Sequence, residues 1–434
     1  MPTLRRGSRQ GSRISGATDG PGGPGAAGQT RASESGTGGR AGGSGAPAGT
    51  GGRATGTGGR AAGTGEWAAG TTGRPGSGRA AVLLDSISPY GSRRVVVEYD
   101  GSTTSAFLHD KSGAIAATWI ANHQPAPESV DLAKLRSGAS PEMPAAHAKH
   151  PGGRPPIAAA ALSVVWFEEG DGVAILEDGE PLAVIPGWAD LSRRMPGYSR
   201  DVIGQTPFAW SLDDAMEGLG QRISQSAQFW RWRASAGSWA LFQEAQLGHL
   251  LARLGPGGSY WDVSGGKTPV VGVSERPPVS RRPYTVLSTI GMSGQRMPGV
   301  EQTGEGADGR ARIELALATT MPTAAAARIF LWLAQFPWRE VTWLGSGHSI
   351  PWYHEPATFP LGGGNEAVLL LDDPSRLPGP EVPRLDGFRA SNDPVRWLWI
   401  VPINERERRL ARERSSASLV TQLAAQRRSW VYSP

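Results

Sequence analysis

The chain has 434 residues, with 44 Lys plus Arg, 39 Asp plus Glu, seven His and no Cys. The lack of cysteine excludes a disulfide framework, a cysteine-ligated zinc site and a thiol nucleophile. The sequence contains no run of about 18 apolar residues and no apolar segment after Arg5 and Arg6, so it predicts neither a transmembrane helix nor a secretory signal. We therefore expect a cytoplasmic protein that does not engage a membrane.

The positive charge is concentrated in residues 1–80. This segment holds 26 of the 61 glycines, ten arginines and three acidic residues, so it carries +7 and the rest of the chain carries −2. Glycine buries little surface and loses the most backbone entropy on ordering, so the composition predicts a disordered Gly/Ala/Thr/Arg-rich tail that folding does not need. An arm that binds RNA is the alternative. It would lack base stacking, because Trp67 is its only large ring, and nucleic acid is therefore disfavoured as a partner.

Residues 81–190 show the alternation and the turn residues of a β-rich N-terminal module. Short apolar runs are separated by turns that contain glycine, such as Asp100-Gly101 and Glu168–Asp171. The predicted strands are 94–99, 103–108, 114–120, 162–167, 172–176 and 181–185. A Pro-rich stretch at 125–156 interrupts them and is predicted to be a surface loop.

Residues 191–239 change to a helical period and are predicted to form a helical connector. Ser211 is placed to cap a helix whose first turn carries Asp213 and Asp214, where acidic side chains complement the helix dipole. A second helix is expected at 237–254, because its apolar residues share one face and a Gly-Pro-Gly-Gly run follows it.

Residues 240–434 combine strands with helices. The predicted strands are 283–290, 311–319, 367–371 and 395–401, and the predicted helices are 323–336 and 416–427. The run from Ile313 to Leu317 alternates as expected for a strand with two different faces. Fifteen of the 16 Trp residues follow residue 80, which indicates a substantial packed core.

The most distinctive motif is the turn Gly345-Ser346-Gly347-His348 between two apolar segments. A hydrolase could use His348 as a base, with Asp372 or Asp373 as its acidic partner. However, the motif is not Gly-x-Ser-x-Gly, and Pro351 prevents the helix that must follow a nucleophile elbow. Because no nucleophile, base and orienting group combine elsewhere, the residues favour a protein that is not an enzyme, and the hydrolase is the alternative.

No motif predicts a metal or another cofactor. Asp372 and Asp373 could bind Mg²⁺, but acidic residues before a proline more often begin a turn. The run Gly266-Lys267-Thr268 matches only the end of a phosphate-binding loop, because Trp261 stands where the first glycine is required. We therefore expect the protein to work without a cofactor.

A run of arginines lies near the C-terminus and is interleaved with acidic residues. Its members are Arg406, Arg408, Arg409, Arg412 and Arg414. Mixed charges at helical spacing are typical of a solvated helix face. A basic groove that binds a partner peptide is the alternative interpretation.

The order of the C-terminal segments resembles the suppressor of fused family. The resemblance spans roughly 240–434. The matching segments are Tyr284–Ser293, Arg312–Ala318, 324–336, Thr342–Trp352, Val368–Pro374 and Val395–Glu405. The preceding part, with Trp119–His123 and Pro186-Gly187-Trp188, looks like the extension carried by actinobacterial members of the family.

This resemblance implies an α/β (α+β) fold in which helices flank a mixed sheet, and it implies no catalysis. Animal members of the family clamp an extended peptide of a transcription factor, which adds a strand to the protein. Bacterial members resemble immunity proteins that block polymorphic toxins. The expected function is therefore a non-enzymatic protein-binding module, either an immunity protein or a regulatory protein, that binds and occludes a protein partner such as a toxin.

Four aromatic residues are predicted to form the partner-binding surface. Trp343 and His348 belong to the glycine turn, and Trp352 and Tyr353 follow Pro351 in a Pro-rich loop. Exposed Trp and Tyr residues on a fixed loop are the side chains most enriched at the energetic centres of interfaces. The alternative is that the rings of Trp352 and Tyr353 cover the end of the sheet.

Overall fold

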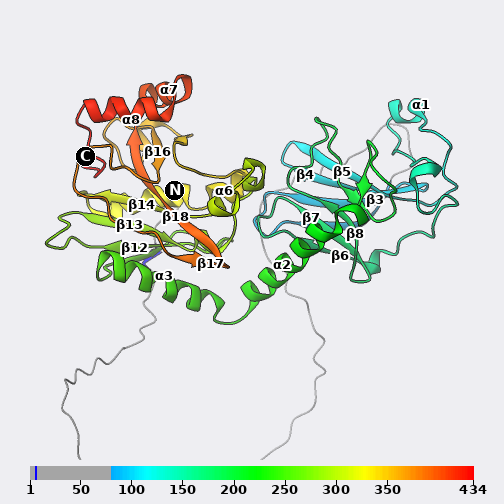
Figure 1. Cartoon of the computed structure of the whole chain (residues 1–434), viewed down its shortest axis with the longest axis horizontal. Helices are drawn as coiled ribbons and strands as arrows, with labels where there is room; N and C mark the ends of the chain where they lie inside the picture. Colours follow the sequence, from blue (N-terminus) through cyan, green and yellow to red (C-terminus); the bar gives the residue numbers. More distant parts are fainter. Residues whose placement is uncertain (1–4, 7–79) are drawn as a thin grey trace, which may run out of the picture. The chain divides into compact units, whose positions relative to one another are not determined.

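The structure, a computed structural model, describes Arg5–Arg6 and residues 80–434 (Figure 1). The rest of the predicted tail, 1–4 and 7–79, lies outside the described residues. No helix in the described part of the chain is long and apolar enough to cross a membrane.

The first sheet of the N-terminal module has the order β2-β3-β4-β5, and all its neighbours are antiparallel. Its strands are β2 (Ala81–Ile87), β3 (Arg94–Tyr99), β4 (Thr103–Asp110) and β5 (Gly113–Asn122). The predicted turn between β3 and β4 is confirmed. Gly101 has a φ of 101°, which favours glycine, and Asp100 accepts the backbone N–H of Thr103 at 2.8 Å.

The second sheet has the order β10-β9-β8-β7-β6. Its strands are β6 (Leu162–Trp166), β7 (Val173–Glu177), β8 (Glu180–Ile185), β9 (Tyr198–Ser199) and β10 (Trp210–Ser211). The sheet therefore continues beyond residue 190 into the stretch predicted to be a helical connector. The division of the chain into domains stays a prediction.

The core of this module is built from alternate residues of both sheets. Ala106 and Leu108 of β4 pack in one buried cluster with Val173 and Ile175 of β7. Successive side chains of a strand point to opposite faces, so the neighbouring residues of β4 and β5 turn away from this core.

Apart from α1, the α-helices of the described residues follow residue 210. They are α1 (Leu132–Arg136), α2 (Met216–Ala234), α3 (Ser238–Leu254), α4 (Thr323–Ala326), α5 (Phe330–Leu333), α6 (Phe336–Glu340), α7 (Glu405–Glu413) and α8 (Ser416–Ala425). The predicted second helix agrees with α3. Ser211 lies in β10, and a 3-10 turn at Asp213–Ala215 precedes α2. The Ser211 hydroxyl accepts the backbone N–H of Asp214 at 3.4 Å, so it caps this 3-10 turn and not α2 itself.

The C-terminal region is built on a nine-stranded sheet. Its order is β1-β11-β12-β13-β14-β18-β16-β15, and β17 pairs with β18. The strands are β1 (Arg5–Arg6), β11 (Tyr260–Asp262), β12 (Gly272–Arg276), β13 (Thr285–Ile290), β14 (Arg312–Thr319), β15 (Ser349–Pro351), β16 (Ala367–Leu371), β17 (Arg389–Ala390) and β18 (Asp393–Ile403). Because β14 and β18 are parallel while the other pairs are antiparallel, the predicted mixed sheet is confirmed.

Both faces of the large sheet are covered by helices, as the fold prediction requires. On one face, Leu315 and Leu317 of β14 join a core cluster with residues of α5 and α6, such as Phe330 and Trp338. On the other face, Ala316 belongs to a second cluster with residues of α3 and α8. The alternation within β14 therefore assigns its side chains to two separate cores.

The helix predicted at 323–336 is interrupted. It is divided into α4, a 3-10 turn at Ala327–Ile329 and α5, and α6 then begins at Phe336 with Pro337 in its first turn. A proline has no backbone N–H and fits only the first turn of a helix. Pro337 therefore supports a new helix start at this point.

The tail prediction needs one correction. Within residues 1–80, Arg5 and Arg6 form strand β1 and pair antiparallel with Asp262 and Trp261 of β11. The edge of β11 presents unpaired backbone N–H and C=O groups, and any extended segment can satisfy them whatever its side chains. Composition alone therefore could not indicate this pairing.

The acidic turn between β6 and β7 contacts α2 and the C-terminal region. Glu168 pairs with Arg312 at 2.7 Å, and Glu169 pairs with Arg222 at 3.4 Å. The carboxylate of Asp171 accepts the backbone N–H of Gly299 at 2.9 Å. The predicted hairpin turn is confirmed, and its carboxylates are held by cationic and amide groups.

Asp171 is expected to make stability depend on pH. Burial, together with the negative charges of Glu169 and Glu301, raises its pKa from 3.8 to about 7. Between these two values the folded protein holds a proton that the unfolded chain has lost. This contribution to the free energy of unfolding is therefore fully present below pH 3.8 and is lost as the pH rises through about 7.

Replacing Asp171 with Asn should flatten this dependence. We expect the variant to be more stable than the unmodified protein at pH 8, by on the order of 2 kcal/mol, and to differ little at pH 4. Denaturant unfolding at both pH values measures the effect, with exposed Asp214→Asn as the control. An unchanged pH dependence in Asp171→Asn would show that this carboxyl does not hold the extra proton.

Candidate protein-binding surface

The four predicted aromatic residues lie at the two ends of β15, which is an edge strand of the large sheet. Ser349–Pro351 pair with Leu369–Ala367 of β16, and no further strand in the described part of the chain pairs with β15. An open sheet edge is where an extended peptide can add as a new strand. Pro351 lacks an N–H, so the edge of β15 offers fewer donors than an ordinary strand.

Trp343 and His348 are brought together before β15. Their ring centroids are 4.4 Å apart, and both side chains are half-buried. Gly347, which has a φ of 87°, turns the chain between them, and its N–H donates to the carbonyl of Leu370 at 2.7 Å. The turn is therefore fixed to β16.

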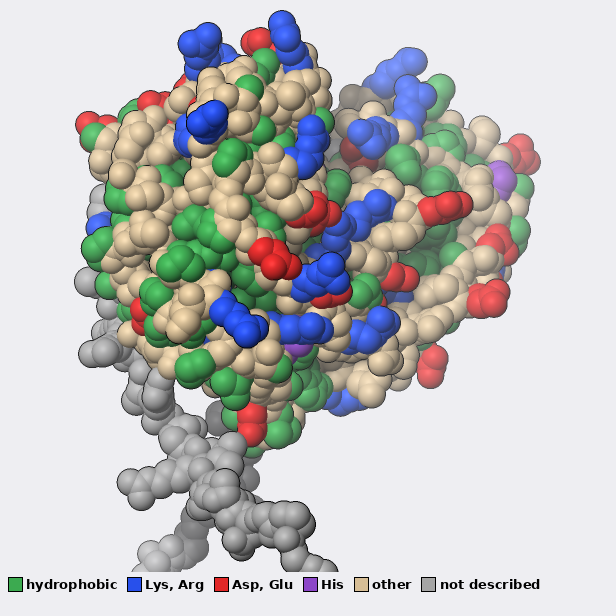
Figure 2. Space-filling model, turned by 60° about the vertical axis from the view of Figure 1, so that its left-hand side comes forward, with side chains coloured by type: hydrophobic (Ala, Val, Ile, Leu, Met, Phe, Trp, Pro, Cys, Tyr) green, Lys and Arg blue, Asp and Glu red, His purple; other side chains and the backbone are tan. Residues whose placement is uncertain are grey.

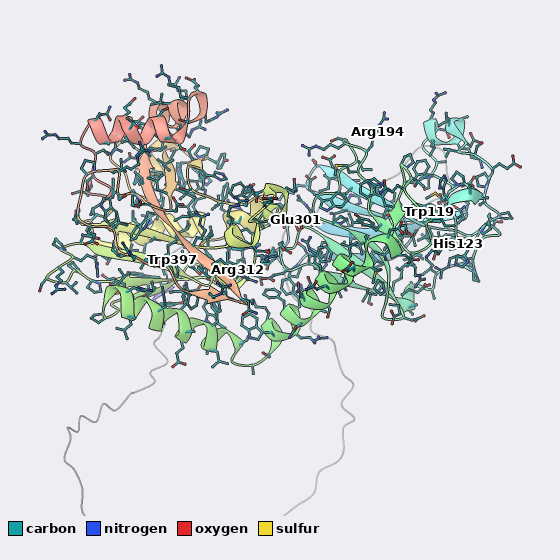
Figure 3. The ribbon with its side chains drawn as sticks, in the orientation of Figure 1. Trp119, His123, Arg194, Glu301, Arg312 and Trp397 are labelled. Carbon is teal, nitrogen blue, oxygen red and sulfur yellow. The ribbon has the colours of Figure 1, made fainter. Side chains whose placement is uncertain are left out.

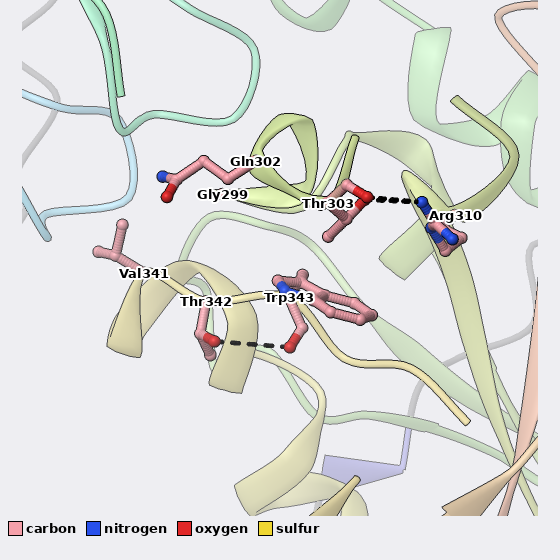
Figure 4. A pocket seen from close by; sticks show the side chains of 7 residues that line it. All are labelled: Gly299, Gln302, Thr303, Arg310, Val341, Thr342 and Trp343. Carbon is pink, nitrogen blue, oxygen red and sulfur yellow. Dashed lines mark hydrogen bonds between the residues drawn. The ribbon is translucent and has the colours of Figure 1, made fainter. Parts of the chain in front are cut away.

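A pocket of about 580 Å³ opens beside Trp343 (Figure 4). It is lined by Gly299, Gln302, Thr303, Arg310, Val341, Thr342 and Trp343. Its wall is fixed because Arg310 donates to the hydroxyl of Thr303 at 3.0 Å and to the carbonyl of Glu305 at 2.8 Å. The arrangement combines an indole ring, a guanidinium and hydroxyl groups, which suits a polar or acidic side chain.

Trp352 and Tyr353 follow β15 and differ in exposure. The Trp352 ring is half-buried and packs edge-on against Trp332, with 5.1 Å between centroids. Its Nε1 donates to the hydroxyl of Thr358 at 3.0 Å, which ties the loop to the short helix that follows. Tyr353 is 66% exposed. The structure therefore presents Tyr353 to solvent on an anchored loop, while much of Trp352 belongs to the core.

The basic run forms helix α7, which contacts β15. Asn404 and Glu407 make a capping box at its start, and Glu407 is buried and pairs with Arg428 at 3.0 Å. Arg406, Arg409, Arg412 and Arg414 are exposed. Lys and Arg side chains gather at the top of the view in Figure 2, at the level of α7 and α8 in Figure 1. The predicted solvated helix face is confirmed, because exposed arginines stand beside the exposed Glu413 on α7.

The hydrolase alternative depends on His348 meeting an acidic group. The turn and the strand end do converge, because Leu370 donates to the carbonyl of His348 at 2.9 Å. However, Asp372 accepts the Ser346 hydroxyl at 2.5 Å and pairs with Arg396 at 2.5 Å. Among the described residues, no hydrogen bond or ion pair joins the His348 ring to Asp372 or Asp373.

The pKa shifts of His348 and Asp372 agree with a carboxylate that is paired elsewhere and not with the imidazole. Burial lowers the pKa of His348, and a hydrogen bond to the backbone of Trp343 opposes this effect. Burial alone would raise the pKa of Asp372, but the Ser346 hydrogen bond and the charge of Arg396 lower it. At neutral pH the imidazole is therefore neutral and the carboxylate is charged and already paired.

Asp373, a candidate ligand for Mg²⁺, takes part in a turn. Asp373 accepts the backbone N–H of Ser375 at 2.9 Å, which is the turn-forming contact that the sequence suggested. In the described part of the chain, no group of three or more His, Asp or Glu side chains could hold a metal ion.

Sequence reasoning missed the residues that line the pocket beside Trp343. Thr303 and Arg310 lie in an irregular segment between β13 and β14, and their side chains meet only because Arg310 reaches back to the Val300–Thr303 turn. No periodic pattern marks such a segment, so the sequence offered no signal for it.

The recognition of the suppressor of fused family is confirmed for the C-terminal region, because residues 266–434 match the family described as Suppressor of fused protein (SUFU). This part of the chain is therefore similar to suppressor of fused domains. None of the curated proteins searched matches the chain.

Solved structures of the same family are similar to part of the chain. A suppressor of fused homologue from Neisseria gonorrhoeae is 17% identical, with a TM-score of 0.32, over 45% of this chain and 100% of that one. A crystal structure of the Sufu–Fu complex is 15% identical, with a TM-score of 0.32, over 44% and 88% of the two chains. Drosophila Suppressor of Fused is 13% identical, with a TM-score of 0.30, over 43% of this chain and 47% of that chain.

Proposed function

We propose that this protein is a non-enzymatic binding module, an immunity or regulatory protein that occludes a protein partner such as a polymorphic toxin. The observation that carries the proposal is the exposure of Tyr353 on an anchored loop beside an open sheet edge. An exposed tyrosine on a rigid loop supplies contact area at little cost in conformational entropy.

The surface that we propose for the partner runs along β15. It includes Trp343 and His348 at one end and Trp352 and Tyr353 at the other. The exposed arginines of α7 lie on the same side, because α7 contacts β15. The partner that fits is an acidic protein whose extended segment lies against the sheet edge.

Replacing Tyr353 with Ala should weaken partner binding at least roughly tenfold and leave thermal unfolding unchanged. The ring is mostly exposed, so its removal creates no cavity. Isothermal titration with the purified product of a neighbouring toxin-like gene measures the affinity. Leu241→Ala on α3 is the matched control, because Leu241 is another large apolar side chain, 68% exposed. Equal affinities for the two variants would reject Tyr353 as an anchor.

Trp352 is a weaker probe of the same surface. Its ring packs against Trp332 and Phe359, so Trp352→Ala is expected to lower stability as well as binding. The single variant Tyr353→Ala therefore separates recognition from folding, whereas a double variant with Trp352→Ala does not.

A further inference from the structure

A second pocket lies in the N-terminal module, away from the surface along β15. Its volume is about 380 Å³, within the range of roughly 300–1,000 Å³ that is typical of small-molecule sites. Apolar side chains dominate its lining, which includes Phe107, Trp119, Leu135, Met195 and Phe208. The pocket is therefore suited to an apolar body.

The floor of the pocket is the outer face of the first sheet. Ser105 and Phe107 of β4 lie opposite Trp119 and Ala117 of β5. The alternate residues of both strands, such as Ala106, face the module core. The floor is rigid because it belongs to a paired sheet that is buried on its other side.

Three loops form the walls, and each is fixed by hydrogen bonds. Leu191 donates to the carbonyl of Ile115 at 2.8 Å, and Trp119 donates to the carbonyl of Phe208 at 3.0 Å. The loop that carries Pro141 is held where Asn122 donates to the carbonyl of Met143 at 2.8 Å. The walls of the pocket are therefore held by the protein's own hydrogen bonds.

One polar group in the floor has no partner. Ser105 is 4% exposed, it lines the pocket, and its hydroxyl makes no hydrogen bond in the described part of the chain. A buried hydroxyl without a partner is costly, so such groups are usually satisfied by the protein, by water or by a ligand. The hydroxyl oxygen is itself buried beneath the floor, so a molecule in the pocket meets the apolar lining and not this hydroxyl.

The rim of the pocket carries a positive charge. Arg194 lines it, is exposed, and has a φ of 56°, a left-handed conformation in a tight turn. Figure 3 shows Arg194 at the periphery of the module and Trp119 within it. No carboxylate among the described residues forms an ion pair with Arg194.

From these features we infer that the N-terminal module binds a small amphiphile with an apolar body and one acidic group. The apolar body lies on Phe107 and Trp119. The acidic group pairs with Arg194. Nothing in this assignment depends on the partner surface along β15.

The probe that tests the site is 1-anilinonaphthalene-8-sulfonate, which has aromatic rings, one N–H and one sulfonate. Titration of the folded full-length chain should give a saturable, one-to-one rise in fluorescence. Ala117→Phe fills the pocket and should weaken binding at least roughly tenfold. Ala114→Phe is the matched control, because Ala114 lies on the same strand, is exposed and does not line the pocket.

A further variant tests the polar contact. Arg194→Gln should weaken the probe and reduce the dependence of its affinity on salt. The inference fails if the probe does not saturate, if Ala117→Phe and Ala114→Phe bind it alike, or if Arg194→Gln binds it as tightly as the unmodified protein.

Discussion

Replacing Arg312 with Met is expected to lower the free energy of unfolding by about 3–5 kcal/mol. Arg312 is 1% exposed and is one of the largest buried side chains of the protein. It pairs with Glu168 at 2.7 Å and with Asp393 at 2.9 Å, and it also donates to the carbonyl of Ser293. Removing the guanidinium leaves two carboxylates in a poorly hydrated environment with less compensation, which is the most costly way to disrupt a buried ion pair.

Two variants separate this charge effect from the loss of packing. Arg339→Met is the matched control, because the Arg339 side chain is 52% exposed and pairs only with its neighbour Glu340. The double variant Arg312→Met with Glu168→Gln should recover part of the lost stability, since it removes one of the stranded charges. Denaturant unfolding measures all three proteins. A loss in Arg312→Met no larger than in Arg339→Met would contradict the buried network.

Replacing Glu314 with Ala is expected to cost roughly 3 kcal/mol or more of unfolding free energy. Glu314 lies on β14 and is fully buried. Its carboxylate accepts the hydroxyl of Thr289 at 2.6 Å, the hydroxyl and N–H of Ser293 at 2.6 and 2.8 Å, and the N–H of Gly291 at 3.1 Å. Burial raises the pKa of Glu314, and the hydrogen bonds from Ser293 and Thr289 oppose that rise.

The loss of stability in Glu314→Ala is expected to be large because Thr289, Gly291 and Ser293 all donate to this carboxylate and lose their acceptor at once. Glu314→Gln keeps the shape and one acceptor oxygen, so it should lose clearly less stability than Glu314→Ala. Glu355→Ala is the control for removal of an exposed carboxylate and should change the unfolding free energy by less than about 0.5 kcal/mol. Similar losses for Glu314→Ala and Glu355→Ala would show that the Glu314 carboxylate does not organise the turn at Gly291 and Ser293.

The fold could be predicted wherever a segment has a clear period or an unambiguous turn. The alternation in 311–319 predicted β14, and the apolar face of 237–254 predicted α3. Short strands such as β9 and β15 were missed, because two or three residues carry no period. Their conformation is imposed by the strands beside them, which is information that no local window contains.

The candidate surface was predicted in part. Exposure of Tyr353 follows from its place between prolines, and the structure agrees. The pocket beside Trp343 and the orphan hydroxyl of Ser105 could not be foreseen, because each depends on loops that are distant in sequence. The ionic contacts of Glu168 also escaped prediction, since its partner Arg312 lies 144 residues further along the chain.

We propose that the protein acts by occluding its protein partner, and one titration tests this most directly. The activity of the partner, for example the toxic activity encoded by a neighbouring gene, is measured while increasing amounts of the chain are added. Occlusion predicts that activity falls linearly and reaches its minimum at one chain per partner, and that dissociating the complex restores it. Complete and irreversible loss of activity with far less than one chain per partner would show turnover, and would contradict a non-enzymatic binding protein.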